Sequence, residues 1–181
     1  MNNEALDVPT KVSFKEAIDL TQLLLDQVGS GQLQESEVKA VVSDLVRTQN
    51  GARGFFVTYL TTDLLIDDRL TNSVVEALRS HPETVAELLV KNVAMSAAQA
   101  LYHRRNQAEE MVQGSLRVQQ RTQKLIQLVN LTAVYQHAQD LLDTATTGEG
   151  HYQDFLNRWG YDTEQRQAMC QALQQVLSRA H

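Results

Sequence analysis

The feature that most constrains the fold is a pattern of apolar residues that recurs after 33 positions. Shifted by that amount, residues 41–60 match residues 74–93. The match lays Val41, Val42, Leu45, Ala52, Phe55, Phe56, Val57 and Leu60 on Val74, Val75, Leu78, Val85, Leu88, Leu89, Val90 and Val93. Each copy reads as helix, short break and helix, and units of roughly 33 to 47 residues built this way stack into α-solenoids. Because such arrays need about three units, the remaining helices must close the stack.

The composition supports a helical chain of this kind. Among 181 residues there are eight glycines, two prolines and 6% aromatic residues, which is typical of helix-rich globular proteins. We therefore predict a single all-α domain over residues 1–181 with about seven helices. Within it, paired α-solenoid-like hairpins span 36–98, a polar basic segment spans 103–124 and further helices span 125–181.

Capping patterns predict where the helices begin and end. Ser13 with Glu16, and Asp162 with Gln165, each have the spacing of a capping box. A helix over 14–28 should end at the glycines that follow it, and a second helix from about residue 35 should stop at Asn50-Gly51. Pro82 suits the first turn of a helix that continues to Arg105.

The C-terminal half is expected to change character along its length. The segment 103–124 is helix-forming but polar, so it is either a helix standing partly clear of the core or a mobile connection. A further helix is predicted from Lys124 to Leu142. The last helix carries one apolar stripe, formed by Met169, Cys170, Leu173, Val176 and Leu177. That stripe is expected to close the core, with a detachable docking helix as the alternative.

The stretch QNGARGFFVTYL at 49–60 raises the question of a phosphate-binding loop. Such a loop follows a strand and, in its Walker form, precedes Lys-Ser/Thr, so that amides and an ammonium converge on the anion. Neither feature is present. We therefore interpret the two glycines as residues that turn the chain and allow close helix packing, with Arg53 outside.

The basic residues of the 103–124 segment are the most informative charged feature. Arg104, Arg105, Arg117, Arg121 and Lys124 lie in a region whose acids are Glu109 and Glu110, within a chain of net charge −6. Arg117, Arg121 and Lys124 share one helix face at i, i+4 and i+7. A stripe of this kind attracts an acidic protein, a phosphate or a nucleic acid, although the overall negative charge disfavours nucleic acid. An ordinary solvated helix face is the alternative.

Two His-x-x-Asp pairs are the weak candidates for metal binding. His137 with Asp140, and His151 with Asp154, have the same spacing on either side of a loop. Helical metal sites instead use Glu-x-x-His pairs, and zinc motifs are absent from the sequence. We therefore assign no metal or cofactor. A Gly-x-Ser-x-Gly motif is also absent, and the single Cys170 is expected to be a small buried hydrophobe, so we predict no catalytic residues.

These observations favour a non-enzymatic interaction or adaptor protein that binds an acidic partner. A regulatory binder of an anion or nucleic acid is the second hypothesis, and a metalloprotein or enzyme using His137 and His151 is the third. The N-terminal sequence lacks the pattern of a signal peptide, and a single cysteine suits a reducing compartment. We accordingly expect a cytoplasmic protein with no membrane span, and the glutamine-rich helical texture favours a bacterial one. A homo-oligomer is possible as well.

Overall fold

The computed structural model describes residues 6–64 and 68–179, with the side chains of Asp68 and Arg69 excepted. The described residues form helices and connections, without a strand, so the fold is all-helical. The described part of the chain contains nine helices, where about seven were expected. They are α1 (Phe14–Gly29), α2 (Glu35–Val46), α3 (Gln49–Tyr59), α4 (Asp68–Leu78), α5 (Pro82–Arg105), α6 (Glu109–Val129), α7 (Thr132–Thr147), α8 (Gln153–Trp159) and α9 (Thr163–Ser178).

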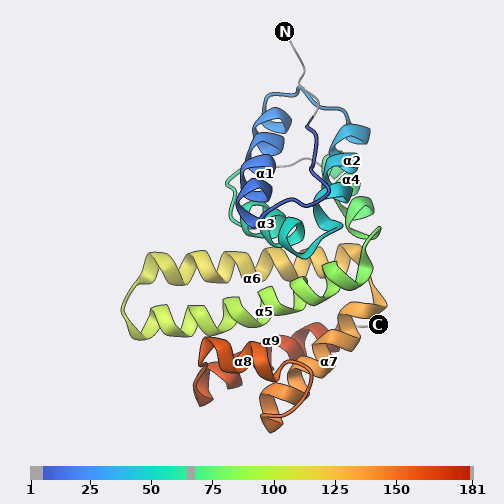
Figure 1. Ribbon diagram of the computed structural model, residues 1–181. Coiled ribbons are helices and arrows are strands. Elements are labelled where there is room, and N and C mark those ends of the chain that lie inside the picture. Colours follow the sequence, from blue (N-terminus) through green and yellow to red (C-terminus); the bar gives the residue numbers. More distant parts are fainter. Residues whose placement is uncertain (1–5, 65–67, 180–181) are drawn as a thin grey trace. The chain divides into compact units, whose positions relative to one another are not determined.

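The chain divides into two compact units, residues 1–85 and residues 86–181, and each is described by itself. The prediction of a single domain stays a prediction. In the first unit α1 packs against α3, and α2 packs against both α3 and α4 (Figure 1). The predicted capping box is present at the start of α1, where Ser13 Oγ accepts from the Glu16 amide and Glu16 accepts from the Ser13 amide.

The close contact of α1 with α3 depends on a glycine. A Cβ atom at Gly54 would lie 2.5 Å from Ala17 Cβ and 2.9 Å from the Phe14 carbonyl oxygen. Phe55 is fully buried beside it and lies in ring contact with Phe56 and Tyr59. Arg53 points outward, with its guanidinium 5.0 Å from the centre of the exposed Phe14 ring. The interpretation of close helix packing is therefore confirmed, but neither glycine turns the chain, because both lie inside α3.

One expected helix boundary in this stretch is wrong. Asn50 and Gly51 do not stop α2, because α2 ends at Val46 and α3 already includes both residues. Thr48 caps α3 by accepting a hydrogen bond from the Gly51 amide at 3.1 Å. A side chain at Gly51 would collide with the Leu45 carbonyl oxygen, which explains the glycine without a turn.

The 33-residue spacing appears in the helix starts. The starts of α3 and α5 are 33 residues apart. Of the eight matched apolar pairs, seven are buried in both copies, and the exception is Val57, which is 45% exposed. However, α3 packs against α1, which lies outside the two predicted hairpins, and α5 runs for 24 residues. The solenoid-like stacking of the hairpins stays a prediction.

In the second unit, a left-handed asparagine interrupts a stretch that was expected to be one helix. The basic segment and the apolar stretch after it form the single helix α6, which passes through Gly114 and ends at Val129. Asn130, with φ 46°, caps α6, and α7 starts at Thr132. The expected helix from Lys124 to Leu142 is therefore wrong, because asparagine tolerates the left-handed conformation that ends a helix.

The last helix closes the core of the second unit. α7 packs against both α8 and α9 (Figure 1). The predicted capping box of Asp162 and Gln165 is present, and Met169, Leu173 and Val176 of the apolar stripe are buried. Cys170 is only half-buried, which corrects the expectation of a buried thiol. Its sulfur lies 3.8 Å from the Thr146 hydroxyl oxygen at the end of α7.

Candidate functional site

The predicted basic stripe lies on a single continuous helix. Arg117, Arg121 and Lys124 belong to α6, with Arg117 and Lys124 exposed and Arg121 half-buried. From Met111 to Val129 this helix carries three cations and no acid. One helical turn further along the same face, Leu128 is 37% exposed. The stripe therefore combines positive charge with an exposed apolar side chain at one end.

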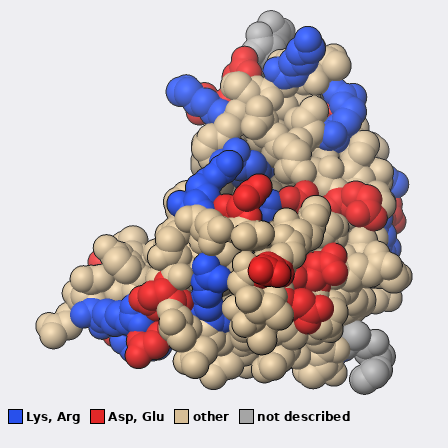
Figure 2. Space-filling view, turned by 60° about the horizontal axis from the view of Figure 1, so that its bottom comes forward, with Lys and Arg blue, Asp and Glu red and all other residues tan. Residues whose placement is uncertain are grey.

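Arg105 does not join this stripe, because acidic residues at the start of α9 bind it. Its guanidinium donates to Asp162 Oδ2 at 2.6 Å, to Asp162 Oδ1 at 3.4 Å, and to the Glu164 carboxylate. The Arg105 guanidinium holds the pKa of the Asp162 carboxyl below its usual value. Acidic and basic groups likewise lie side by side on the face drawn in Figure 2. Arg105 thus fixes α5 to α9, and the predicted five-residue basic site is divided.

Arg104 lies at a hollow between α5, α6 and α9. The hollow has a volume of about 330 Å³. Arg104 and Glu164 both line it, but most of its lining consists of alanine and glutamine side chains. These are Ala97, Ala100, Gln119, Gln167, Ala168, Gln171, Ala172 and Gln175. Sequence reasoning did not identify this surface, because glutamines spaced along two helices give no motif.

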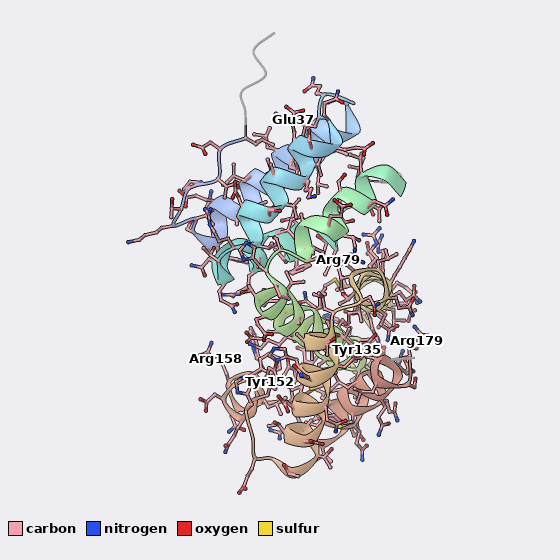
Figure 3. All side chains as sticks on the ribbon, turned by 90° about the vertical axis from the view of Figure 1, so that its right-hand side faces the viewer. Glu37, Arg79, Tyr135, Tyr152, Arg158 and Arg179 are labelled. Atoms are coloured by element: carbon pink, nitrogen blue, oxygen red, sulfur yellow. The ribbon has the colours of Figure 1, made fainter. Side chains whose placement is uncertain are left out.

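The two histidines considered for metal binding do come together, but around a tyrosine. The imidazole rings of His137 and His151 are 6.4 Å apart, centre to centre. The buried Tyr152 lies between α7 and α8, with its hydroxyl oxygen 2.6 Å from His137 Nδ1 (Figure 3). The ammonium group of Lys91, on α5, makes cation–π contacts with the rings of Tyr152 and Phe155. Its Nζ lies 5.7 Å and 5.3 Å from the ring centres.

The carboxylates of the two His-x-x-Asp pairs do not complete a metal site with these histidines. Asp140 and Asp154 are both exposed. Within residues 6–64 and 68–179, no three His, Cys, Asp or Glu side chains form a group that could hold a metal ion. The His137–Tyr152 hydrogen bond instead joins two helices, which is a structural role that helical spacing alone did not reveal.

A second and larger hollow opens where α7 ends and α9 begins. Its volume is about 680 Å³, within the range of small-molecule sites in proteins. The lining comes from the last turn of α7 and the first two turns of α9, and includes Thr147, Gly148, Thr163, Arg166 and Cys170. The sequence offered one signal for it, the loop TATTGEG followed by a capped helix, but a loop next to a helix start is too common to indicate a site.

These observations define an all-helical protein that carries a charged helix face and two surface hollows. The family model described as uncharacterised conserved protein UCP020893 matches residues 13–176, so the chain belongs to that family. No curated protein and no solved structure matches this chain. Within the described residues, no helix has the length and apolar character needed to cross a membrane.

Proposed function

We propose that this chain is a non-enzymatic interaction protein that binds an acidic protein through the exposed face of α6. The observation that supports it best is the run of Arg117, Arg121 and Lys124 on one helix that carries no acid from Met111 to Val129. The chain has a net charge of −6, so such a concentration of cations is unlike the rest of the molecule. Charge complementarity of this kind steers association and selects partners.

Leu128 extends the same face and supports a protein partner. Interfaces combine a desolvated apolar centre with charged residues at the rim, and arginine is enriched in them. A phosphate backbone has no comparable use for an exposed leucine. The α-solenoid-like stacking of the 36–98 hairpins, which would add a helical surface to the interaction, belongs to the same proposal, as does the cytoplasmic location that the single cysteine favours.

The second hypothesis, an anion or nucleic-acid binder using all five basic residues, is weaker. It needs Arg105, and the acidic groups of Asp162 and Glu164 already occupy that guanidinium. The remaining cations, Arg104 and the α6 stripe, form two groups on different helices. A nucleic-acid binder would show a steep loss of affinity with added salt and a preference for polynucleotides over acidic peptides.

A direct test compares the wild-type protein with a variant carrying Arg117→Glu, Arg121→Glu and Lys124→Glu. Both proteins are immobilised and exposed to a fluorescent polyglutamate peptide, a DNA oligonucleotide and the lysate of the native organism. We expect the triple variant to lose polyglutamate binding and to lose the lysate protein that wild type retains. Binding to the oligonucleotide should be weak for both proteins.

The matched control reverses three exposed cations that do not lie on α6, Lys11→Glu, Arg53→Glu and Arg158→Glu, which gives the same change in net charge. This control should bind like wild type. If both triple variants lose binding equally, net charge and not the α6 face governs association, and the proposal fails. Stronger binding of wild type to the oligonucleotide than to polyglutamate would favour the second hypothesis.

A further inference from the structure

Two stretches of the second unit lack acidic residues, and the helices that they form line a common depression. Residues 111–139 and 165–179 contain no Asp or Glu, although the whole chain holds 22 of these residues. The first stretch covers most of α6 and the first half of α7, and the second covers most of α9. All side chains that line the depression come from these acid-free stretches.

The depression is shallow and has an apolar floor. Ile126 of α6 and Val176 of α9 are buried at its base, beside the half-buried Tyr135 of α7. The other lining residues are polar or charged: Gln123, Gln127 and Arg179, of which Arg179 lies with Tyr135 in the view of Figure 3. An apolar side chain placed here would therefore cover apolar surface and meet a neutral or positive rim.

The depression is continuous with the basic stripe of α6. Lys124 and Gln127 are neighbours at i, i+3 on that helix, and Gln127 lines the depression. At the same edge Gln123 Nε2 donates to Gln175 Oε1 of α9 at 3.3 Å. Because Arg179 follows Gln175 by one helical turn, this hydrogen bond holds the cationic end of α9 beside α6.

The helix ends near the depression are electrostatically compensated. Arg179 is the C-cap residue of α9, where a cation offsets the negative partial charge of the last carbonyl oxygens. α6 ends at Val129 and α7 starts at Thr132, so the positive end of one helix follows the negative end of the other. Arg117 and Arg121 precede the end of α6 by about three and about two turns. Carboxylates of a partner would thus face the middle of α6 and an apolar group its end.

We infer that the partner of α6 presents an acidic peptide segment with one apolar side chain, which covers the depression between α6, α7 and α9. The inference rests on the proposed function and adds the chemistry of the partner. The carboxylates of the segment face Arg117, Arg121 and Lys124, while its apolar side chain packs on Tyr135. Protein interfaces combine an apolar centre with a charged rim and are enriched in tyrosine and arginine. An anionic polymer without apolar side chains would leave the depression uncovered.

Two fluorescent polyglutamate peptides of equal length and charge test this inference. One carries a leucine in its middle, and the other carries an alanine at the same position. Fluorescence anisotropy at constant ionic strength gives the Kd of each peptide for the wild-type protein. We expect the leucine peptide to bind about fivefold more tightly, because it buries more apolar surface. Equal affinities would overturn the inference and leave the proposed function intact, whereas binding of neither peptide would overturn both.

Tyr135→Ala removes the aromatic wall of the depression and leaves every charge in place. It should abolish most of the preference for leucine, with an unchanged Kd for the alanine peptide. Tyr102→Ala is the matched control, since Tyr102 is 51% exposed on α5 and does not line the depression. This control should keep the wild-type preference. A preference that survives in the Tyr135 variant, or that is lost equally in both variants, would contradict the inference.

Cross-linking locates the apolar side chain on the wild-type protein, and it serves as the test if Tyr135→Ala lowers the helical content. The leucine of the peptide is replaced by photo-leucine, the complex is irradiated, and the digested protein is analysed by mass spectrometry. We expect cross-links at Gln127, Tyr135 or Arg179, suppressed by an excess of the unlabelled leucine peptide. Suppressible cross-links that lie only elsewhere on the chain would overturn the inference.

Discussion

The two compact units differ in how they use polar and charged residues. Residues 1–85 contain seven Lys and Arg against thirteen Asp and Glu, whereas residues 86–181 contain nine of each. The second unit also holds fifteen of the twenty glutamines. The net negative charge of the protein therefore resides in the first unit. The second unit presents amide surfaces and local basic groups, which is why both proposed sites lie within it.

The cores of the two units also differ in the hydrogen bonds that their buried polar side chains make. In the first unit, the buried hydroxyls of Thr21 and Thr58 donate to carbonyls of their own helices, Ala17 and Gly54. Helices α1 and α3 themselves meet closely at Gly54, beside the buried Phe55. In the second unit, Tyr152 and His137 form a side-chain hydrogen bond between two helices. Close packing characterises one core and a specific polar contact the other.

The largest effect is expected at Gly54. In Gly54→Ala the new methyl group would lie 2.5 Å from Ala17 Cβ and 2.9 Å from a backbone oxygen, so α1 and α3 must separate. We expect a loss of about 3 kcal/mol in unfolding free energy. Urea unfolding followed by circular dichroism measures it. A loss below about 1 kcal/mol would show that the first unit is not tightly packed at this contact.

The same variant tests whether the units unfold together. Trp159 is the only tryptophan and lies in the second unit, so its fluorescence reports that unit, while circular dichroism reports the whole chain. If the chain is the single cooperative domain predicted from its length, Gly54→Ala shifts both transitions equally. A shift in circular dichroism alone would mean that the units unfold separately.

The second effect concerns the polar contact of the second unit. Tyr152→Phe removes the hydroxyl that lies 2.6 Å from His137 Nδ1 and leaves the ring in place. We expect a loss of about 1 kcal/mol in unfolding free energy, since the hydrogen bond between α7 and the start of α8 is lost. Thermal unfolding at pH 7 measures it. An unchanged midpoint would show that the bond contributes nothing net.

Tyr161→Phe should raise the unfolding free energy, in contrast to Tyr152→Phe, because the buried Tyr161 hydroxyl has no hydrogen-bond partner in the described chain. We expect a gain of about 1 kcal/mol. Burial raises the pKa of Tyr161 to about 12, against 10 for an exposed tyrosine. The wild type therefore loses stability as the pH rises above 10, since only the unfolded chain ionises readily, and the variant loses less. Unfolding curves at pH 8 and pH 11 compare them.

Gly114→Ala provides the counterpart of Gly54→Ala in the second unit. Nothing lies within 4 Å of a Cβ atom at this position in the middle of α6. Alanine should therefore raise the unfolding free energy by about 0.5 to 1 kcal/mol, through its higher helix propensity. Chemical unfolding measures the gain. A loss would contradict the open environment that the structure gives to Gly114.

The smallest effect is a change in acid sensitivity. Arg105 lowers the pKa of Asp162, so the stabilisation is present above the ordinary aspartate pKa and disappears as the pH falls through the lowered value. Arg105→Gln should therefore have a lower melting midpoint at pH 7 but nearly the wild-type midpoint at pH 2. Lys15→Gln, which removes the exposed pair with Asp19, serves as the control in the first unit.

Much of the helical layout could be predicted from the sequence, because caps and apolar spacing are local signals. The capping boxes at Ser13 and Asp162 and the helix from Pro82 to Arg105 are confirmed. Asn130 was missed because a left-handed asparagine within an apolar stretch resembles a helical surface residue. Gly51 was wrongly predicted to end a helix. Glycine is needed there because a side chain would collide with the Leu45 carbonyl oxygen.

The candidate sites were less predictable, because they depend on contacts between distant segments. Spacing placed Arg117, Arg121 and Lys124 on one face, and the structure keeps them on one helix. Spacing could not show that Arg105 pairs with residues 57 and 59 positions away. It also could not show that Thr163, Arg166 and Cys170 face the end of α7.

The carboxylate of Asp162 caps α9 by accepting from the Gln165 amide and also holds Arg105 at the end of α5. A single fluctuation that frees this carboxylate would release the start of one helix and the end of another at the same time. Backbone amides of Gln165 and of the last turn of α5 should therefore exchange with deuterated solvent at correlated rates, despite their distance along the chain.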